Sequence, residues 1–567
     1  MADNTRVAAS LVLPADTITG VLSERAREFP TARTIFPSTG ATLTLSELDA
    51  AVDRHARGLA EAGVRRGDVV GLLAPTGADL LVCLLGIMRA GAAVTVLPAP
   101  LGTNKLGAHA ERLCRTLEVA GVERLVGADA YAPLLAELTS RHGALDIVAP
   151  SAAGTLDSLP ELDSNDPAVV QFTSGSTGSP RGVTLTHGNV VAGLSAIIEG
   201  AALVPDDVLI QWVPLYHDMG LFGLLANMLN GAESHVFAPF DFLRGPGDVL
   251  RYLAERHGTL MTGPNFAYEL LAGAAEPVLK SGLDLSRWRL AFNGAEPVSA
   301  ATVRRFLDVL GPAGVRPSTM FPVYGMAEVT LAISFPEPGS VPRTVRIDGD
   351  SLRTGDRVRL VAERDSAARE LVSVGRPVPG IDVRVTGVGG TPCAEEELGE
   401  IQVRGAAVTS GYLHDGKATR AAFDGPWLRT GDLGFRHRGD LYIAGRRKEM
   451  AIVHGRNIFP EDVEAVARDV PGVYRGRCVA APISARDGTE LVALVVETEL
   501  SAPEHPGLVD AVRRRVAAAM DLHAVRIHIV NPHWLTRTSS GKWQRLQAVR
   551  AAAAEATNVP RSRSGRQ

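Results

Sequence analysis

The sequence has few cysteines, and their spacing forms no pattern. It holds 4 cysteines in 567 residues, namely Cys83, Cys114, Cys393 and Cys478. They lie far apart with no C-x-x-C pair, so the spacing indicates neither a zinc site nor a disulfide framework. We therefore expect reduced thiols, as in a cytoplasmic protein.

Long apolar runs and an excess of one charge are also lacking. No apolar run approaches the roughly 20 residues needed to cross a bilayer, and "MADNTRVAASLVLPADT" lacks the pattern of a signal peptide. The 58 Lys and Arg residues against 63 Asp and Glu residues leave a net charge of -5. Because no basic excess is present, a nucleic-acid partner is not indicated. We expect a protein that is not secreted, enters no membrane and binds no nucleic acid.

Apolar residues are plentiful and follow regular periods. At 46% of the chain they can fill large cores, and 567 residues exceed what one core supports, so two or more domains are expected. Apolar residues recur at three- and four-residue spacing in 45–68, with a stop at Gly63, and predict a helix before the buried strand "VVGLLA". The stretch 78–98 repeats this order. The alternation predicts an α/β fold with helices packed on mostly parallel sheets.

The composition of the chain changes near residues 445–460. A charged, glycine-bearing segment there precedes a short strand and a helix expected to begin around Pro460. We therefore predict a large domain over 1–448 and a small domain over 449–567. The last stretch, about 551–567, loses apolar periodicity and is expected to be a disordered tail.

A run rich in glycine, serine and threonine, "QFTSGSTGSPRGVTLTH" (171–187), follows a strand-like stretch and precedes a helical one. We interpret it as a strand-to-helix turn that binds phosphate through backbone amides and hydroxyls. Its spacing matches neither the Walker loop nor the G-x-S-x-G elbow. The alternative, a solvated Gly-Ser linker, is disfavoured because linkers do not usually join a buried strand to a helix.

This run closely resembles the phosphate-binding loop of the adenylate-forming superfamily, with the pattern [YF]-T-S-G-[ST]-T-G-x-P-K-G. Arg181 departs from it, because lysine is usual there and a planar guanidinium positions phosphate differently from a point charge. Further stretches resemble motifs of that superfamily in order, namely "VPLYHDMGL" (213–221), "FNGAEPV" (292–298), "VYGMAEVTL" (323–331), "RTGDLGF" (429–435), "GRRKEMAIVHGRNIFPEDVE" (445–464) and "TSSGKWQR" (538–545).

The resemblance extends from about residue 20 to about residue 550. It implies the acyl-adenylate-forming fold: a large N-terminal domain of mostly parallel sheets flanked by helices, and a small, mobile C-terminal α+β domain. It also implies that ATP and Mg²⁺ are used to join a carboxylate to the α-phosphate, with release of pyrophosphate.

The resemblance assigns the nucleotide-binding residues motif by motif. Those of the phosphate loop are Thr173, Ser174, Gly175, Ser176, Thr177, Gly178 and Arg181. Those that line the adenine and carboxylate side are Asn293, Gly294, Ala295 and Glu296. Those of the adenine motif are Tyr324, Gly325, Met326 and Ala327.

Further residues receive individual roles from the same resemblance. Tyr324 presents an aromatic face to adenine, and Glu328 offers Mg²⁺ a hard oxygen ligand and belongs to the catalytic set. Asp432 accepts the ribose hydroxyls, and Arg446 joins it. Without the surrounding motifs, these residues would be interpreted as a packed aromatic, a solvated carboxylate and a turn former.

Two more residues complete the predicted catalytic set. His217 is placed near the substrate carboxylate and not as a nucleophile, although a lone histidine is more often structural. Lys542, in the turn "SSGK", would present its ammonium to the charge that develops at phosphorus, carried there by the mobile small domain. Glu449 matches the hinge position, where aspartate is more common.

The stretches "TGPNFAYELL" (262–271), "FPVYGMAE" (321–328) and "HGRNIFPEDVE" (454–464) look most like those of fatty acyl-AMP ligases. Such enzymes activate an acyl chain and hand it to the phosphopantetheine thiol of an acyl carrier protein. The nearest alternative is an acyl-CoA synthetase or a relative that adenylates a polar carboxylate. A catalytically silent binding protein on the same fold is a third possibility, against which the intact Glu328, Asp432 and Lys542 argue.

A charged stretch with few aromatics, 336–370, separates the adenine motif from "VGRPVPG" (374–380). It is too polar to be core, and its pieces "TVRI" and "RVRLV" predict a small surface hairpin. It can be a loop without function, since long insertions cost little free energy. By resemblance, fatty acyl-AMP ligases carry an insertion here that packs against the large domain, restrains the small one and disfavours thioester formation with free CoA.

Overall fold

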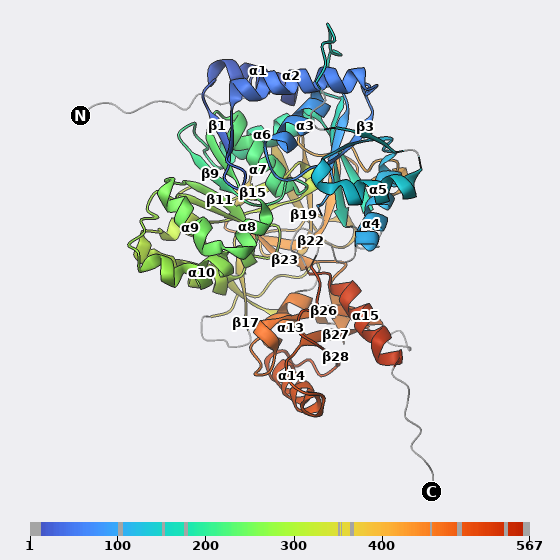
Figure 1. The fold of residues 1–567 in the computed structure, drawn as a ribbon. Coiled ribbons are helices and arrows are strands. Elements are labelled where there is room, and N and C mark those ends of the chain that lie inside the picture. The colour runs from blue at the N-terminus through green and yellow to red at the C-terminus, as the bar shows by residue number, and fades with distance from the viewer. Residues whose placement is uncertain are drawn as a thin grey trace, which may run out of the picture. The chain divides into compact units, whose positions relative to one another are not determined.

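The computed structural model describes residues 13–99, 106–143, 145–149, 153–174, 180–349, 352, 354–362, 368–453, 456–484, 490–537 and 543–558 (Figure 1). By its internal contacts the chain divides into two compact units. The first consists of Met1–Arg343, Val372–Val383 and Gln402–Thr430, and the second of Thr344–Leu371, Arg384–Ile401 and Gly431–Gln567. The second unit thus takes in residues before 449. The boundary after residue 448 stays a prediction about which part of the chain moves as a body.

The first unit contains a seven-stranded sheet whose neighbouring strands are parallel, except for the antiparallel pair of β1 and β2. Its strand order is β13 (Met320–Pro322), β12 (Leu290–Asn293), β11 (Leu260–Gly263), β9 (Val208–Gln211), β10 (Glu233–Val236), β1 (Arg33–Phe36) and β2 (Ala41–Thr44). The helices that follow or connect these strands are α7 (Asp218–Leu229), α8 (Pro239–Arg244), α9 (Pro246–Glu255), α10 (Asn265–Leu279) and α11 (Ala300–Leu310).

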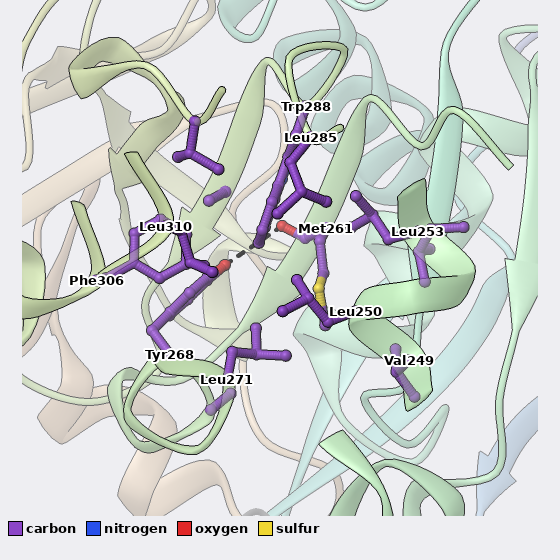
Figure 2. Close-up of a cluster of buried hydrophobic side chains, with 14 of the residues drawn as sticks. Val249, Leu250, Leu253, Met261, Tyr268, Leu271, Leu285, Trp288, Phe306 and Leu310 are labelled. Carbon is purple, nitrogen blue, oxygen red and sulfur yellow. Dashed lines mark hydrogen bonds between the residues drawn. The ribbon is translucent and has the colours of Figure 1, made fainter. Parts of the chain in front are cut away.

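Aromatic side chains form the core between this sheet and helices α9, α10 and α11 (Figure 2). Phe306 meets both Tyr268 and Trp288 edge to face, with ring centroids 5.3 and 5.4 Å apart. The hydroxyl of the fully buried Tyr268 donates a hydrogen bond to the carbonyl oxygen of Phe292 at 2.6 Å. Burial of large rings together with this hydrogen bond holds α10 against the ends of β11 and β12.

A second, six-stranded sheet of the first unit is also mostly parallel, with an antiparallel pair at one edge. Its order is β6 (Asp146–Val148), β5 (Arg124–Gly127), β3 (Val69–Leu73), β4 (Ala93–Val96), β7 (Pro167–Ser174) and β8 (Pro180–Thr186). The helices of this part are α1 (Ile18–Glu28), α2 (Leu45–Glu61), α3 (Ala78–Arg89), α4 (Leu106–Ala120), α5 (Ala132–His142) and α6 (His187–Gly200).

The helix and strand alternation expected over residues 45–98 is confirmed. Helix α2 begins where Thr44 and Glu47 cap each other's backbone amides, and it ends before Gly63, whose φ is +86°. Strand β3, helix α3 and strand β4 then follow in order, with β3 and β4 parallel. The predicted α/β class with helix-flanked parallel sheets is therefore correct.

The Gly-Ser-Thr run is not the strand-to-helix turn that we expected. It connects two antiparallel strands, with Thr173 opposite Arg181 and Ser174 opposite Pro180, while residues 175–179 lie outside the described part of the chain. The last part of the run, "GVTLT", alternates valine or leucine with threonine and belongs to β8. Helix α6 begins only at His187, where the hydroxyl of Thr186 accepts a hydrogen bond from the Asn189 amide.

Smaller strands complete the first unit and lead into the second. A three-stranded sheet joins β14 (Tyr324–Gly325), β15 (Ala332–Phe335) and β18 (Arg376–Pro377). Strands β19 (Ile381–Thr386), β20 (Gly399–Gly405) and β22 (Trp427–His437) contribute residues to both units. The adjoining elements are α12 (Gly416–Ala422), β21 (Phe423–Asp424) and β23 (Asp440–Arg446).

The second unit has the expected α+β character. Strand β27 (Glu490–Glu497) is antiparallel to β26 (Cys478–Ser484) and parallel to β28 (Val525–Val530). The other elements are β24 (Ala451–Val453), β25 (Arg456–Ile458), α13 (Pro460–Ala467), α14 (His505–Met520) and α15 (Arg545–Asn558). Helix α13 begins at Pro460 as predicted. Residues 551–558, expected in a disordered tail, instead continue α15, because their alanines favour a helix.

The charged stretch 336–370 contains the expected pairing but is not a surface hairpin of two strands. Its first strand, β16 (Thr344–Asp348), meets "RVRLV" through an antiparallel bridge between Ile347 and Leu360 and through two backbone hydrogen bonds, from the Asp348 amide to the Arg359 carbonyl oxygen and from the Val361 amide to the Arg346 carbonyl oxygen. The same strand also pairs with β17 (Ala368–Val372). The stretch is also not too polar for a core. Its buried side chains share one cluster with residues of the C-terminal part of the chain, and these side chains are Ile347, Leu352, Val358 and Leu371.

The four cysteines are buried, and none of them forms a disulfide. Across the residues that the structure describes, no helix is both long enough and apolar enough to span a bilayer.

Candidate active site

The adenine motif forms a tight turn at the edge of the three-stranded sheet. Tyr324 pairs with Ser334 across β14 and β15, and Gly325 follows it. A Cβ atom on Gly325 would lie 1.8 Å from the carbonyl oxygen of Leu331, so the close approach of the two backbones requires glycine. Met326 then leads into a 3₁₀ helix over Ala327–Val329, which includes Glu328.

Glu328 is held by contacts from a distant part of the sequence. Its side chain is buried, its Oε1 accepts a hydrogen bond from the Tyr412 hydroxyl at 3.0 Å, and its carbonyl oxygen accepts one from the Thr409 amide at 2.8 Å. The guanidinium carbon of Arg181 lies 5.7 Å from the centre of the Tyr412 ring. Tyr412 thus connects the predicted metal ligand with the predicted phosphate-binding cation.

Tyr412 contacts two predicted site residues, Glu328 and Arg181, and was not predicted from the sequence. It lies 84 residues after Glu328, and no periodicity or spacing connects the two positions. Its place follows from backbone pairing, because Tyr412 forms an antiparallel bridge with Val183 of β8 and the Leu413 amide donates to the carbonyl oxygen of Gly182. The only local signal was an aromatic residue after a glycine in "TSGYLHD".

The phosphate-loop residues are described in part. Thr173 and Arg181 face each other on β7 and β8, and the backbone of Ser174 pairs with Pro180. The remaining predicted residues of this loop lie outside the described part of the chain, and they are Gly175, Ser176, Thr177 and Gly178.

The "FNGAE" residues follow the carboxyl end of β12, an edge at which open α/β sheets bind ligands. Asn293 is fully buried and lies opposite Gly263 of β11 and Pro322 of β13. Gly294 and Ala295 turn the chain, with a φ of +64° at Ala295. The half-buried Glu296 then accepts a hydrogen bond from the Phe266 amide at 2.9 Å, which fixes its carboxylate at the start of α10.

His217 stands directly before helix α7, after a turn that its amide closes with the Pro214 carbonyl oxygen at 3.1 Å. Its ring centre lies 4.9 Å from that of Tyr216. Burial raises the pKa of Tyr216 to about 12, so its hydroxyl keeps its proton at neutral pH. The Gln171 side-chain amide donates to the Tyr216 carbonyl oxygen, which attaches this turn to β7.

The predicted ribose-binding pair lies in the second unit. Asp432 and Arg446 are opposite each other on β22 and β23, and Arg446 Nε donates to Asp432 Oδ1 at 2.9 Å. The Asp432 side chain is 6% exposed and that of Arg446 52%. A buried carboxylate whose charge is balanced by one guanidinium is suited to accept hydrogen bonds from a diol.

Lys542 lies outside the described residues. The residues that flank it are held together, since Arg537 and Trp543 form an antiparallel bridge and the Arg537 guanidinium carbon lies 3.9 Å from the Trp543 ring centre. Glu449, at the predicted hinge, forms an ion pair of 3.2 Å with Arg545.

The single carboxylate predicted as a metal ligand, that of Glu328, fits Mg²⁺ better than a metal held by protein ligands alone. No group of three or more His, Cys, Asp or Glu side chains gathers for a metal ion within the described ranges. Mg²⁺ is commonly bound by one or two carboxylates together with substrate phosphates and water. The buried, hydrogen-bonded carboxylate of Glu328 can serve as such a single ligand.

Comparison with known proteins gives consistent results. A family model described as AMP-binding enzyme matches residues 22–413. The 4-hydroxyphenylalkanoate adenylyltransferase of Mycobacterium marinum is 34% identical over 518 residues, which cover 84% of this chain and 81% of that protein. The long-chain-fatty-acid–AMP ligase FadD26 of Mycobacterium tuberculosis is 33% identical over 518 residues, covering 85% of this chain and 87% of that protein.

A solved structure from a study of fatty acyl-adenylate ligases of E. coli and L. pneumophila matches with a TM-score of 0.89 and 30% identity. The match covers 96% of this chain and 99% of that one. The chain therefore belongs to the AMP-binding enzymes of the adenylate-forming superfamily, and the relatives it resembles include fatty acyl-AMP ligases.

Proposed function

We propose that the protein activates a fatty or related carboxylic acid to acyl-AMP and then transfers the acyl group to the phosphopantetheine thiol of an acyl carrier protein. Relatives named as a long-chain-fatty-acid–AMP ligase and as an adenylyltransferase support the first reaction. Four buried cysteines that form no disulfide support a cytoplasmic location, where thiols stay reduced.

In the first reaction a carboxylate oxygen attacks the α-phosphorus of ATP, and the bond from that phosphorus to the pyrophosphate oxygen breaks. Glu328 holds the metal ligand position, with Tyr412 fixing its carboxylate, and Asp432 with Arg446 orients the ribose. When bound, Mg²⁺ neutralises charge on the phosphates. The ammonium of Lys542 stabilises the additional charge of the transition state. In the second reaction the thiol sulfur attacks the acyl carbon and AMP leaves.

The observation that carries the choice of thiol partner is the packing of segment 344–371. Both ends of this segment run directly into the first unit, yet the segment itself packs within the second. Its Arg369 forms an ion pair of 2.8 Å with Asp462 of helix α13, and the Arg369 guanidinium carbon lies 4.8 Å from the Phe459 ring centre. A segment held in this way restrains the movement that a small domain makes to admit free CoA.

Asp462 makes this contact dependent on charge. Burial raises its pKa from 3.8 to about 6, while the neighbouring Arg369 lowers it. At neutral pH the carboxylate is therefore ionised and attracts the guanidinium, and below about pH 6 it gains a proton and the attraction weakens.

ATP–pyrophosphate exchange against a panel of fatty and polar carboxylic acids tests the first reaction, with mass spectrometry for acyl-AMP. Equal concentrations of CoA and a phosphopantetheinylated acyl carrier protein are then offered to the enzyme. We expect exchange with a fatty or related acid and an acyl thioester mainly on the carrier protein. Exchange with no acid contradicts the proposal, and efficient acyl-CoA synthesis favours the acyl-CoA synthetase alternative.

Arg369→Gln is expected to raise acyl-CoA yield by roughly tenfold. This change corresponds to about 1.4 kcal/mol, which lies between the effect of losing an exposed ion pair and that of removing one partner from a buried one. Deleting the whole segment is less informative, because it also removes Ile347 and Val358 from a buried cluster. Acyl-CoA is measured by mass spectrometry, with adenylation monitored in parallel.

The matched control for Arg369 is Arg359→Gln in the same segment. Arg359 pairs with Asp348 on the surface and is 69% exposed, so its loss should leave the thioester products as they are in the wild type. If Arg369→Gln produces no more acyl-CoA than Arg359→Gln, the segment does not restrain the reaction through this ion pair.

Tyr412→Phe is expected to raise the Mg²⁺ concentration for half-maximal adenylation by roughly fivefold, because one hydrogen bond of about 1 kcal/mol no longer orients the Glu328 carboxylate. The measurement is a Mg²⁺ titration of pyrophosphate release. Tyr474→Phe is the control, since it also removes a hydrogen-bonded hydroxyl, in that case one that meets His533 at the surface of the second unit. Identical Mg²⁺ curves for wild type and Tyr412→Phe would remove Tyr412 from the site.

A further inference from the structure

Two buried polar atoms on one face of the seven-stranded sheet have no hydrogen-bond partner among the described residues. They are Nε1 of Trp212 and Oδ1 of Asn293. Trp212 is 3% exposed and Asn293 is 0% exposed. Because buried polar atoms are costly without a partner, proteins usually satisfy them with a protein group, a water or a ligand.

The strand register places these two side chains in one row. The pairs Leu209 with Leu260 and Ile210 with Met261 align β9 with β11, which brings Trp212, one residue beyond β9, level with Gly263. Gly263 in turn lies opposite Asn293 of β12. Residues paired in this way point to the same face of a parallel sheet. The row is therefore an indole, a glycine without a side chain, and an amide.

The indole is held over the glycine. Its Nε1 lies 3.6 Å from the position that a Cβ atom on Gly263 would occupy. It stacks on Phe242 with ring centroids 3.9 Å apart and meets Phe266 edge to face at 6.0 Å. These two rings prevent the indole from turning its N–H toward another partner.

The side-chain amide of Asn293 is oriented by the contacts of its nitrogen atom, Nδ2. Its Nδ2 donates to Oδ1 of Asn265 at 3.4 Å and lies 3.7 Å from the sulfur of Met320. Asn265 Oδ1 also accepts from the Ser299 amide and its Nδ2 donates to Thr302, so the position of Asn265 is fixed by α11 and the residue before it. The Oδ1 of Asn293 is thereby left as an acceptor in the row.

We propose that Trp212 and Asn293 recognise a hydroxyl group on the carboxylic acid that the enzyme activates. A hydroxyl accepts one hydrogen bond and donates another, which matches an indole N–H donor and an amide oxygen acceptor. Trp212 and Asn293 lie on either side of the single strand β11, with neighbouring strands roughly 4.8 Å apart, so the proposal places the hydroxyl oxygen between the two side chains, near Gly263. A plain alkyl chain offers neither a donor nor an acceptor there.

This inference rests on the proposed function, because it assigns the row to the acid site beside the "FNGAE" motif. It goes further by naming the substrate class, namely carboxylic acids whose hydroxyl lies near Gly263 when the acid is bound. Carboxylic acids without such a group are expected to be activated as well, with a lower kcat/KM.

The test compares matched acids in pyrophosphate release, namely decanoic acid with 3-hydroxydecanoic and 10-hydroxydecanoic acid, and 3-phenylpropanoic acid with 3-(4-hydroxyphenyl)propanoic acid. For the wild type we expect at least one hydroxylated acid to exceed its unsubstituted partner in kcat/KM by on the order of tenfold. In Trp212→Phe, which keeps an aromatic ring on Phe242 but lacks the N–H, this ratio should fall toward one.

Trp288→Phe is the matched control. Trp288 belongs to the same core and is labelled in Figure 2, but its Nε1 already donates to the Leu290 carbonyl oxygen at 3.1 Å. The hydroxyl preference of this variant should equal that of the wild type. Thermal unfolding and ATP binding of both variants verify that they are folded.

Equal kcat/KM values for all matched acids in the wild type would overturn the inference, and so would a preference that persists in Trp212→Phe. In either case Nε1 of Trp212 and Oδ1 of Asn293 bind a buried water and do not recognise the substrate. Failure of the proposed function looks different, because no acid of either kind would then support pyrophosphate release.

Discussion

Lys542→Ala is expected to lower the rate of adenylation by about 10²–10³-fold while ATP still binds. Such a loss corresponds to about 2.7–4 kcal/mol of transition-state stabilisation, the range for removing one donor that faces developing negative charge. The ammonium is needed only when charge builds up as the carboxylate oxygen and the pyrophosphate oxygen exchange at phosphorus. The affinity for ATP should therefore change far less than kcat.

The measurement for Lys542 combines pyrophosphate release under saturating substrates with calorimetric titration of ATP. Lys280→Ala is the control, because Lys280 is an exposed lysine directly after α10 that pairs with Glu276 of that helix. Adenylation by Lys542→Ala within tenfold of the wild-type rate would exclude the proposed role. A loss of ATP binding in that variant would move the role of Lys542 from the transition state to the ground state.

Arg545→Ala is expected to lower the free energy of unfolding of the second unit by about 3–5 kcal/mol, the usual cost of removing one partner from a buried ion cluster. Arg545 begins helix α15 and is 19% exposed. It forms ion pairs with Glu464 at 2.6 Å, Glu461 at 2.9 Å and Glu449 at 3.2 Å. Without the guanidinium, these carboxylates would face one another with no cation between them.

The free energy of unfolding that Arg545→Ala loses should depend on pH in a defined direction. Burial raises the pKa of Glu464, and Arg545 opposes that rise. A glutamate with a raised pKa holds its proton more tightly in the folded state than in the unfolded state. The ionised carboxylate therefore destabilises the folded state, and this destabilisation is absent at low pH and grows as pH increases through the folded pKa. The variant should therefore be more strongly destabilised at pH 8 than at pH 5.

Denaturant unfolding at both pH values measures the effect of Arg545→Ala. Arg513→Ala on helix α14 is the control, because Arg513 pairs with Asp510 at the surface and should contribute no more than about 1 kcal/mol. A change of less than 1 kcal/mol for Arg545→Ala, or one that is the same at pH 5 and pH 8, would contradict the buried-cluster explanation.

Several features of the fold followed from short-range patterns. The helix of residues 45–61 and the strand after it were evident from apolar periodicity and the glycine stop, because both depend on neighbours three or four residues apart. The start of helix α13 at Pro460 was equally local, since proline suits the first turn of a helix.

Predictions from short-range patterns were wrong where a segment pairs or packs with residues that are distant in the sequence. "GVTLT" was passed over as part of a loop, although it becomes a strand once β7 provides an antiparallel neighbour. The insertion was taken for surface because charges dominate its composition, yet Ile347 and Val358 point to one side and become buried against residues such as Phe459. Composition does not reveal which face of a strand another segment will cover.

By itself the sequence determined the fold class, the order of the motifs and the family, because these are carried by local periodicity and by residue types at short spacing. Only the tertiary structure decided that Tyr412 contacts Glu328, that Arg545 gathers three carboxylates, and that Trp212 and Asn293 share a row with Gly263. These contacts join residues tens of positions apart. Their formation depends on strand register and on burial of whole faces, and neither is encoded in any single stretch of the chain.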